Sequence, residues 1–152
     1  MASITVSEAR TYARIAHTGD DAAIAVAIDA AETELEMRTG WCVNAGTRTQ
    51  YVASKPADWL LKLERQPASA AAIGSTALEL VTIGGLVHAK IPDTTVFPVT
   101  VTVTVSASPN TLLKLALLQR VTETVQRRGD DTSAPSSAYW DNICTMLGKA
   151  VG

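Results

Sequence analysis

The chain has 152 residues, of which 47% are hydrophobic, so it can fold around a core and is not disordered throughout. Its net charge of −2 and pI of about 5.6 argue against a protein whose main task is to bind phosphate backbones, so nucleic acid is not expected as a direct ligand. No apolar run approaches the roughly 18 residues that span a bilayer, and no basic stretch followed by an apolar core opens the chain. We therefore expect a soluble protein without an export signal.

Two helices are predicted at the N-terminus. Thr5 and Glu8 have the spacing of a capping box, and the apolar stripe that follows predicts a helix over 5–17. After a short turn, apolar residues again recur at helical spacing and predict a second helix over 20–39, which Gly40 ends. Because the connection is short, the two helices are expected to pack as a pair.

Between residues 46 and 106 the apolar period shortens to two, which is typical of antiparallel β-strands. Short strands are predicted over 47–52, 59–63, 70–73, 77–83, 86–91 and 99–106. The dipeptide Gly84-Gly85 predicts a tight hairpin turn between the fourth and fifth of these strands. In the last strand, threonines alternate with valines from Val99 to Val105, so one of its faces is polar and meets either water or a partner.

A third, long helix is predicted over 110–128. The leucines between Leu112 and Leu118 point in every direction around its first turns, so one packing partner cannot cover them all. The helix closes with Arg127 and Arg128, which suit the negative end of the helix dipole. We therefore expect a lone molecule to leave part of this apolar surface in water, and copies of the chain to share it.

A loop rich in small and polar residues comes next, followed by a short C-terminal helix that carries Tyr139 and Trp140. Such a short helix is not stable alone, so it is expected to dock on its own molecule or on a neighbour. The predicted fold is α+β, with an N-terminal helical pair, a central antiparallel β region, a long helix and a short C-terminal helix. We expect a core over 1–129 and an appended linker with a docking helix over 130–152.

The sequence contains no arrangement typical of catalysis or of metal binding. His17 and His88 have no carboxylate or cysteine at a ligand-like spacing, and Asp20-Asp21 stands at a helix start, where carboxylates are favoured for structural reasons. Cys42 and Cys144 form no CxxC motif, so neither a zinc site nor a disulfide framework is expected, and a reducing cytosol is the simplest compartment. Phosphate-binding glycine motifs and nucleophile elbows are also missing. We expect that the protein is not an enzyme and that it binds neither a cofactor nor a metal.

Several side chains are instead candidates for an interface. Arg10 and Arg14 lie one turn apart as a like-charge pair, which favours an acidic partner surface. A tryptophan on a terminal helix is typical of an anchor, either for its own core or for a neighbour. The interface candidates are Arg10, Arg14, Leu112, Leu113, Leu117, Arg127, Arg128, Tyr139 and Trp140.

Several segments carry a resemblance to a known family. They are Thr5–Ile15 with Gly19–Ile24, Glu32–Gly40, Leu61–Ala68, and Pro98–Val105 with Pro109–Leu118 and Arg127–Asp130. In this order they are similar to the head–tail connector, or portal adaptor, family of tailed bacteriophages. One departure is Thr124–Arg127, which stands where the family commonly has an aromatic residue followed by Glu, Asn and Arg.

The resemblance implies a structural virion protein that forms a ring, typically a dodecamer, between the portal protein and a downstream tail or stopper protein. Such a ring extends the DNA channel, lets DNA pass without sequence readout, and gives tail proteins a docking surface. It implies a place at the head–tail junction, with assembly in the host cytoplasm and no membrane. A closed ring uses head-to-tail contacts, in which each subunit offers two different surfaces.

Other functions stay open at this stage. A tail-completion protein also forms rings in the same region of a virion. A small-ligand binding module would instead be a monomer with a lined pocket between strands and helices. An enzyme with a nonstandard site would show a cleft that holds carboxylates of shifted pKa.

Overall fold

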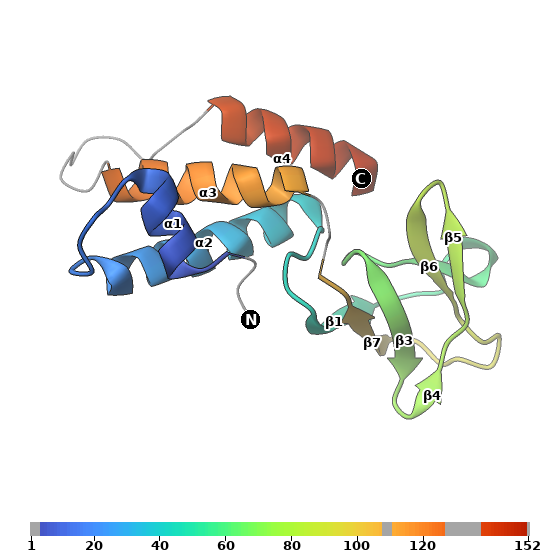
Figure 1. Cartoon of the computed structure of the whole chain (residues 1–152). Coiled ribbons are helices and arrows are strands. Elements are labelled where there is room, and N and C mark those ends of the chain that lie inside the picture. The colour runs from blue at the N-terminus through green and yellow to red at the C-terminus, as the bar shows by residue number, and fades with distance from the viewer. Residues whose placement is uncertain (1–3, 108–110, 127–137, 152) are drawn as a thin grey trace. The chain divides into compact units, whose positions relative to one another are not determined.

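The computed structural model describes residues 4–107, 111–126 and 138–151, and the chain divides into two compact units. The helical unit combines Met1–Thr39 with Pro109–Ala150, and the β unit consists of Gly40–Ser108. Figure 1 shows the helices gathered in the first unit and the strands in the second. The predicted α+β fold class is therefore confirmed.

The helical unit contains α1 (Val6–Ala13), α2 (Asp21–Thr39), α3 (Thr111–Gln126) and α4 (Ala138–Val151). Helix α2 packs against α3, and α1 contacts both, which confirms the predicted pairing of the N-terminal helices. Helices α2, α3 and α4 run side by side in Figure 1. Apolar side chains from these helices form the core of the unit: Ile24, Ile28, Leu35, Leu113, Leu117 and Val121.

Helix α1 begins as predicted but ends earlier. The hydroxyl oxygen of Thr5 accepts the backbone N–H of Glu8 at 3.1 Å, and the Glu8 carboxylate accepts the N–H of Thr5 at 2.8 Å, which completes the capping box. The extension of this helix to residue 17 is wrong, because Arg14 adopts a left-handed conformation with φ 58°. The N–H groups of Arg14 and Ile15 donate to carbonyls of the preceding turn, and this Schellman motif closes the helix after Ala13.

The β unit contains two antiparallel sheets, with strand orders β1-β7-β3-β4 and β2-β6-β5. The strands are β1 (Gly46–Val52), β2 (Leu60–Lys62), β3 (Ala68–Ile73), β4 (Thr76–Ala77), β5 (Leu80–Ile83), β6 (Leu86–Lys90) and β7 (Val99–Val105), and a 3-10 turn, η1, covers Ala57–Trp59. Buried side chains from both sheets form one core, among them Leu63, Ala89, Val101 and Val103. The unit therefore has its own apolar interior.

The hairpin predicted at Gly84 and Gly85 is confirmed. Ile83 pairs with Leu86 across the turn, and the two glycines have φ values of 59° and 81°. Positive φ at both central residues is what a type I′ turn requires, and glycine meets this requirement without steric cost.

The single strand predicted over 77–83 is wrong. Strand β4 ends at Ala77 and pairs with β3, whereas β5 begins at Leu80 and pairs with β6 in the other sheet. Between them, the side chain of Leu78 is buried, and its backbone N–H donates to the carbonyl of Ala71 at 2.8 Å. The chain therefore crosses from one sheet to the other at a point where the alternating pattern gave no sign of a break.

The polar face predicted for the last strand is confirmed. Thr100, Thr102 and Thr104 of β7 alternate with buried valines, and each is opposite an exposed residue of β1. This side of the four-stranded sheet carries hydroxyl groups along two neighbouring strands.

Two glutamines are buried in the β unit, and hydrogen bonds satisfy their amides. The Gln66 amide donates to the carbonyls of Leu63 and Val87, both at 3.0 Å, and accepts the N–H of Val87 at 3.3 Å. The Gln50 amide of β1 donates to the carbonyl of Lys62 at 3.0 Å and accepts a backbone N–H at 3.0 Å. Because buried amides are costly when unsatisfied, these bonds fix the register between neighbouring segments of the unit.

Candidate assembly surfaces

The leucines at the start of α3 divide into a buried and an exposed group. Leu113 and Leu117 are buried against the other helices, whereas Leu112 is 60% exposed and Leu115 is 42% exposed. A helix presents one side to its packing partners, so residues three or four positions apart are buried together. Residues on the opposite side of the helix face outward. A single copy of the chain therefore leaves apolar surface of α3 in contact with water.

A groove of about 340 Å³ lies beside this surface, between α1 and α3. Among the described residues it is lined by Ser7, Glu8, Thr11, Tyr12 and Leu118. Tyr12 is exposed, and together with Leu112, Leu115 and Leu118 it forms what we call the α1–α3 face.

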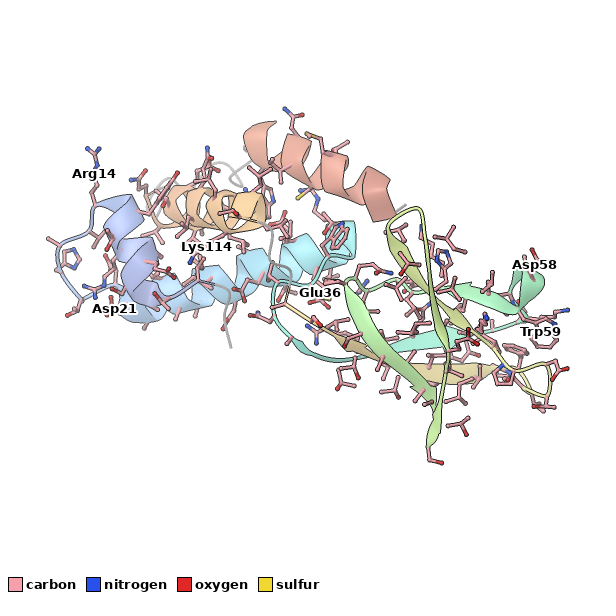
Figure 2. All side chains as sticks on the ribbon, turned by 45° about the vertical axis from the view of Figure 1, so that its right-hand side comes forward. Arg14, Asp21, Glu36, Asp58, Trp59 and Lys114 are labelled. Carbon is pink, nitrogen blue, oxygen red and sulfur yellow. The ribbon has the colours of Figure 1, made fainter. Side chains whose placement is uncertain are left out.

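An ion pair joins α1 to α3 at this groove. Lys114 Nζ donates to a carboxylate oxygen of Glu8 at 2.6 Å, and Figure 2 shows Lys114 on α3. The hydrogen bond from Lys114, with the backbone N–H of Thr5, lowers the pKa of Glu8 below its ordinary value. Because both side chains are partly exposed, this ion pair contributes little to the stability of the fold.

A second apolar surface lies on α2. Val26 is 69% exposed and Met37 is 73% exposed, and both belong to the side of the helix opposite the buried Ile24, Ile28 and Leu35. A groove of about 630 Å³ follows this side and is lined, within the described part of the chain, by Val26, Asp29, Ala30, Thr33, Glu34, Met37 and Arg38. We call Val26, Asp29, Ala30, Thr33 and Met37 the α2 outer face.

Helix α4 docks on its own molecule through Trp140, which is 1% exposed. The indole N–H of Trp140 donates to Glu34 of α2 at 3.1 Å, and Arg120 of α3 donates to the same carboxylate at 3.1 Å. The Arg120 guanidinium also lies 5.5 Å from the centre of the Trp140 ring. A further ion pair of 2.9 Å joins Arg38 of α2 to Asp141 of α4.

Two groups at this network have shifted pKa values. Burial alone would raise the pKa of Glu34, but the hydrogen bonds from Trp140 and Arg120 outweigh it, so that the pKa lies below its ordinary value. Burial raises the pKa of the Cys144 thiol on α4. The carboxylate of Glu34 is therefore ionised when it holds Trp140 in place.

The structure places the predicted interface residues in three groups. Leu113, Leu117 and Trp140 are buried within the helical unit, so they are not exposed for an interface in the single chain; of the two places that the sequence left open for Trp140, the structure shows the one in its own core. Leu112 is exposed, as an interface residue should be. The residues Arg127 and Arg128 and the side chain of Tyr139 lie outside the described part of the chain.

The two N-terminal arginines have different surroundings. Arg10 Nε lies 3.0 Å from a carboxylate oxygen of Asp21, so this pair ties α1 to the start of α2. Arg14 is exposed and forms no ion pair with any described residue. Figure 2 shows it projecting from the end of α1. Only Arg14 of this pair is therefore available to a partner.

Sequence reasoning missed the α2 outer face and the part that Tyr12 plays in the other face. The signal for the former was present, because Val26, Ala30 and Met37 recur at helical spacing outside the stripe that contains Ile28 and Leu35. The exposure of Tyr12 could not be predicted, because it belongs to the apolar stripe of the first helix and that stripe does not show which of its side chains face water.

The β unit carries a strained aromatic corner. Asp58 and Trp59 are consecutive residues with positive φ, at 54° and 58°, a conformation that costs energy for residues other than glycine. Lys55 Nζ lies 4.4 Å from the centre of the Trp59 ring, and Phe97 packs against that ring with centroids 6.4 Å apart. Figure 2 shows Asp58 and Trp59 together at one end of the unit.

Within the described residues, no group of three or more His, Cys, Asp or Glu side chains could hold a metal ion. No described helix is both long enough and apolar enough to cross a membrane.

No protein-family model and no curated protein sequence matches this chain significantly. Solved structures do match it. A chain of the neck of an empty GTA particle, computed with C6 symmetry, superposes with a TM-score of 0.73 and 17% identity, over 95% of this chain and 89% of that chain. A chain of the virion of a native gene transfer agent (GTA) particle superposes with a TM-score of 0.67 and 18% identity, over 97% and 88% of the two chains.

These likenesses show a shared fold over almost the whole length of the chain. The chain thus has the fold of components of a gene transfer agent particle, one of them in its neck, and this supports the resemblance to head–tail connectors.

Proposed function

We propose that this chain is a structural virion protein of the neck, which forms a ring adaptor between the portal and the tail. The observation that carries the proposal is the likeness, with a TM-score of 0.73, to a chain of a GTA particle neck computed with C6 symmetry. The likeness extends through both the helical unit and the β unit, because it covers 95% of this chain. In the ring, copies of the chain extend the DNA channel and give tail proteins a surface on which to dock.

The exposed apolar side chains of the helical unit support a role in assembly. Leu112 and Leu115 of α3 and Val26 and Met37 of α2 are all exposed in the single chain. Each buried apolar side chain contributes roughly 1.5–3 kcal/mol, so covering these residues between copies favours association. Exposed apolar patches of this kind are typical of protein interfaces.

The charge of the chain suits a channel through which DNA moves. A net charge of −2 offers little attraction to phosphates, so DNA would pass without being held and without sequence readout. The role is geometric rather than catalytic, and we propose that the chain is not an enzyme. It would assemble in the host cytoplasm and reside at the head–tail junction.

Negative-stain imaging of the purified full chain, alone and mixed with a candidate portal protein, tests this proposal. Rings with a central opening, free or stacked on the portal, are expected. A chain that stays monomeric at every concentration and never binds the portal would contradict the proposal. Rings that bind the end of the tail tube and ignore the portal would instead indicate a tail-completion protein.

A further inference from the structure

The helical unit exposes two apolar surfaces that differ in shape and charge. The α2 outer face carries the exposed side chains of Val26 and Met37 and lines a groove of about 630 Å³, whereas the α1–α3 face contains the smaller groove of about 340 Å³ lined by Tyr12 and Leu118. Helix α2 packs on α3 through the side opposite Val26 and Met37, so the two faces are distinct surfaces of one unit. Distinct, complementary surfaces favour head-to-tail contacts over a symmetric dimer.

Two exposed charged residues, one on the α2 outer face and one two residues beyond Tyr12 at the end of α1, are not neutralised within the described chain. Asp29 is exposed on the α2 outer face and Arg14 is exposed at the end of α1, and neither forms an ion pair with a described residue. Most basic side chains of the described helices do form such pairs: Arg10 with Asp21, Lys114 with Glu8, and Arg38 and Arg120 with Glu34. The signs at Arg14 and Asp29 are opposite, as they should be if the two faces meet.

The spacing along the two helices is compatible with one contact that uses both features. About 12 Å of helix separates Asp29 from Met37, and about 10 Å of chain separates Arg14 from Ser7 at the groove. When α2 of one copy lies antiparallel to α1 of the next, Asp29 meets Arg14 while Met37 reaches the groove. A flexible, polarizable methionine is well suited to filling such a groove.

We propose that the α2 outer face of one copy packs on the α1–α3 face of the next copy, with Asp29 against Arg14 and Met37 in the groove at Ser7. This inference rests on the proposed ring function and names the surfaces that build the ring. The occupant of each face is a second copy of this chain.

Charge reversal tests the pairing on the full chain. Arg14→Asp places two acids at each contact, and Asp29→Arg places two bases there, so each variant alone should associate at least about fivefold more weakly than wild type. The double variant restores an ion pair with reversed polarity and should assemble like wild type. A mixture of the two single variants should also assemble, because copies that alternate around the ring bring opposite charges together at every contact.

Sedimentation velocity on the chain, alone and with the portal protein, measures the assembled fraction. Asp93→Arg in the β unit is the matched control, since Asp93 is exposed and belongs to neither face. Thermal melting confirms that all variants are folded, and aspartate tolerates the left-handed conformation at position 14. As an independent probe of the groove, Met37→Asp should weaken assembly, whereas Val96→Asp, at the exposed Val96 of the β unit, should not.

The outcomes separate this inference from the function on which it rests. If wild type forms rings and both charge reversals assemble as well as wild type, the pairing of these faces is wrong and the ring function stands. If the single variants fail and neither the double variant nor the mixture recovers, the direct contact between Arg14 and Asp29 is wrong. If wild type forms no ring under any condition, the proposed function itself fails.

Discussion

Replacing Trp140 by alanine should destabilise the helical unit by about 3–5 kcal/mol, the usual cost of removing a buried aromatic side chain. Trp140 is 1% exposed and joins α4 to α2 through Glu34, so the substitution leaves both a cavity and a weakened polar network. Trp140→Phe keeps most of the apolar volume and removes only the indole donor. Its cost should be smaller, about 1–2 kcal/mol, because Glu34 keeps its bonds to Arg120 and Arg38.

Thermal unfolding followed by far-ultraviolet circular dichroism measures both effects. For a domain of the size of the helical unit, each kcal/mol of lost stability lowers the melting temperature by about 4–8 °C. The alanine variant should therefore melt far below wild type, and the phenylalanine variant should melt between the two. Met146→Ala is the matched control, because Met146 lies on the same helix and is exposed. If the free energy of unfolding of Trp140→Ala lies within about 0.5 kcal/mol of that of the control, α4 does not dock through Trp140.

Three further predictions concern titration, the α3 leucines and the hairpin. The pKa of Glu34 in the folded chain lies below its ordinary value of 4.5, so its ionised form stabilises the fold above that pH and this stability is lost as the pH falls through the folded pKa. Below about pH 5, the free energy of unfolding of wild type should therefore fall more steeply with pH than that of Glu34→Gln. If denaturant titrations at several pH values give the same dependence on pH for both proteins, the result would argue against the network. Leu117→Ala should lower the free energy of unfolding, measured by chemical denaturation, by about 2–5 kcal/mol. Leu112→Ala should leave the free energy of unfolding of the monomer within about 0.5 kcal/mol of wild type and weaken only assembly. The reverse order would mean that the buried side of α3 is misassigned. Gly85→Ala should destabilise the β unit by about 1 kcal/mol, because Gly85 has φ 81°, and an unchanged melting curve would contradict the type I′ turn.

Local signals in the sequence predicted the parts of the fold that local chemistry decides. Thr5 and Glu8 satisfy each other across one helical turn, and Gly84-Gly85 supplies the positive φ values of a hairpin, so both features follow from a few neighbouring residues. The alternation of valine and threonine in β7 likewise predicted one buried and one polar face. These elements are as the sequence indicates because no distant contact overrides them.

Two features of the fold were not predicted from the sequence, for different reasons. Nothing near Arg14 marks the end of α1, since glycine rather than arginine is usual at a left-handed helix terminus. The division of the strand at Leu78 depends on which sheet each half joins, and pairing partners are not written into a short β-rich segment.

The sequence also did not predict which side chains of the candidate surfaces are exposed. The sequence predicted that the leucines of α3 exceed what one partner covers, but it could not tell the exposed Leu112 from the buried Leu113 and Leu117. That distinction depends on which side of α3 faces α2. Trp140 was left open between its own core and a neighbour, and only the bond to Glu34 assigns it to its own core.

Cryo-electron microscopy of assembled particles tests the central claim most directly, because it images the neck itself. We expect density between portal and tail that copies of this chain fill as a closed ring, with the α2 outer face of each copy against the α1–α3 face of the next. Neck density that other chains explain completely, with this chain absent from the particle, would contradict it.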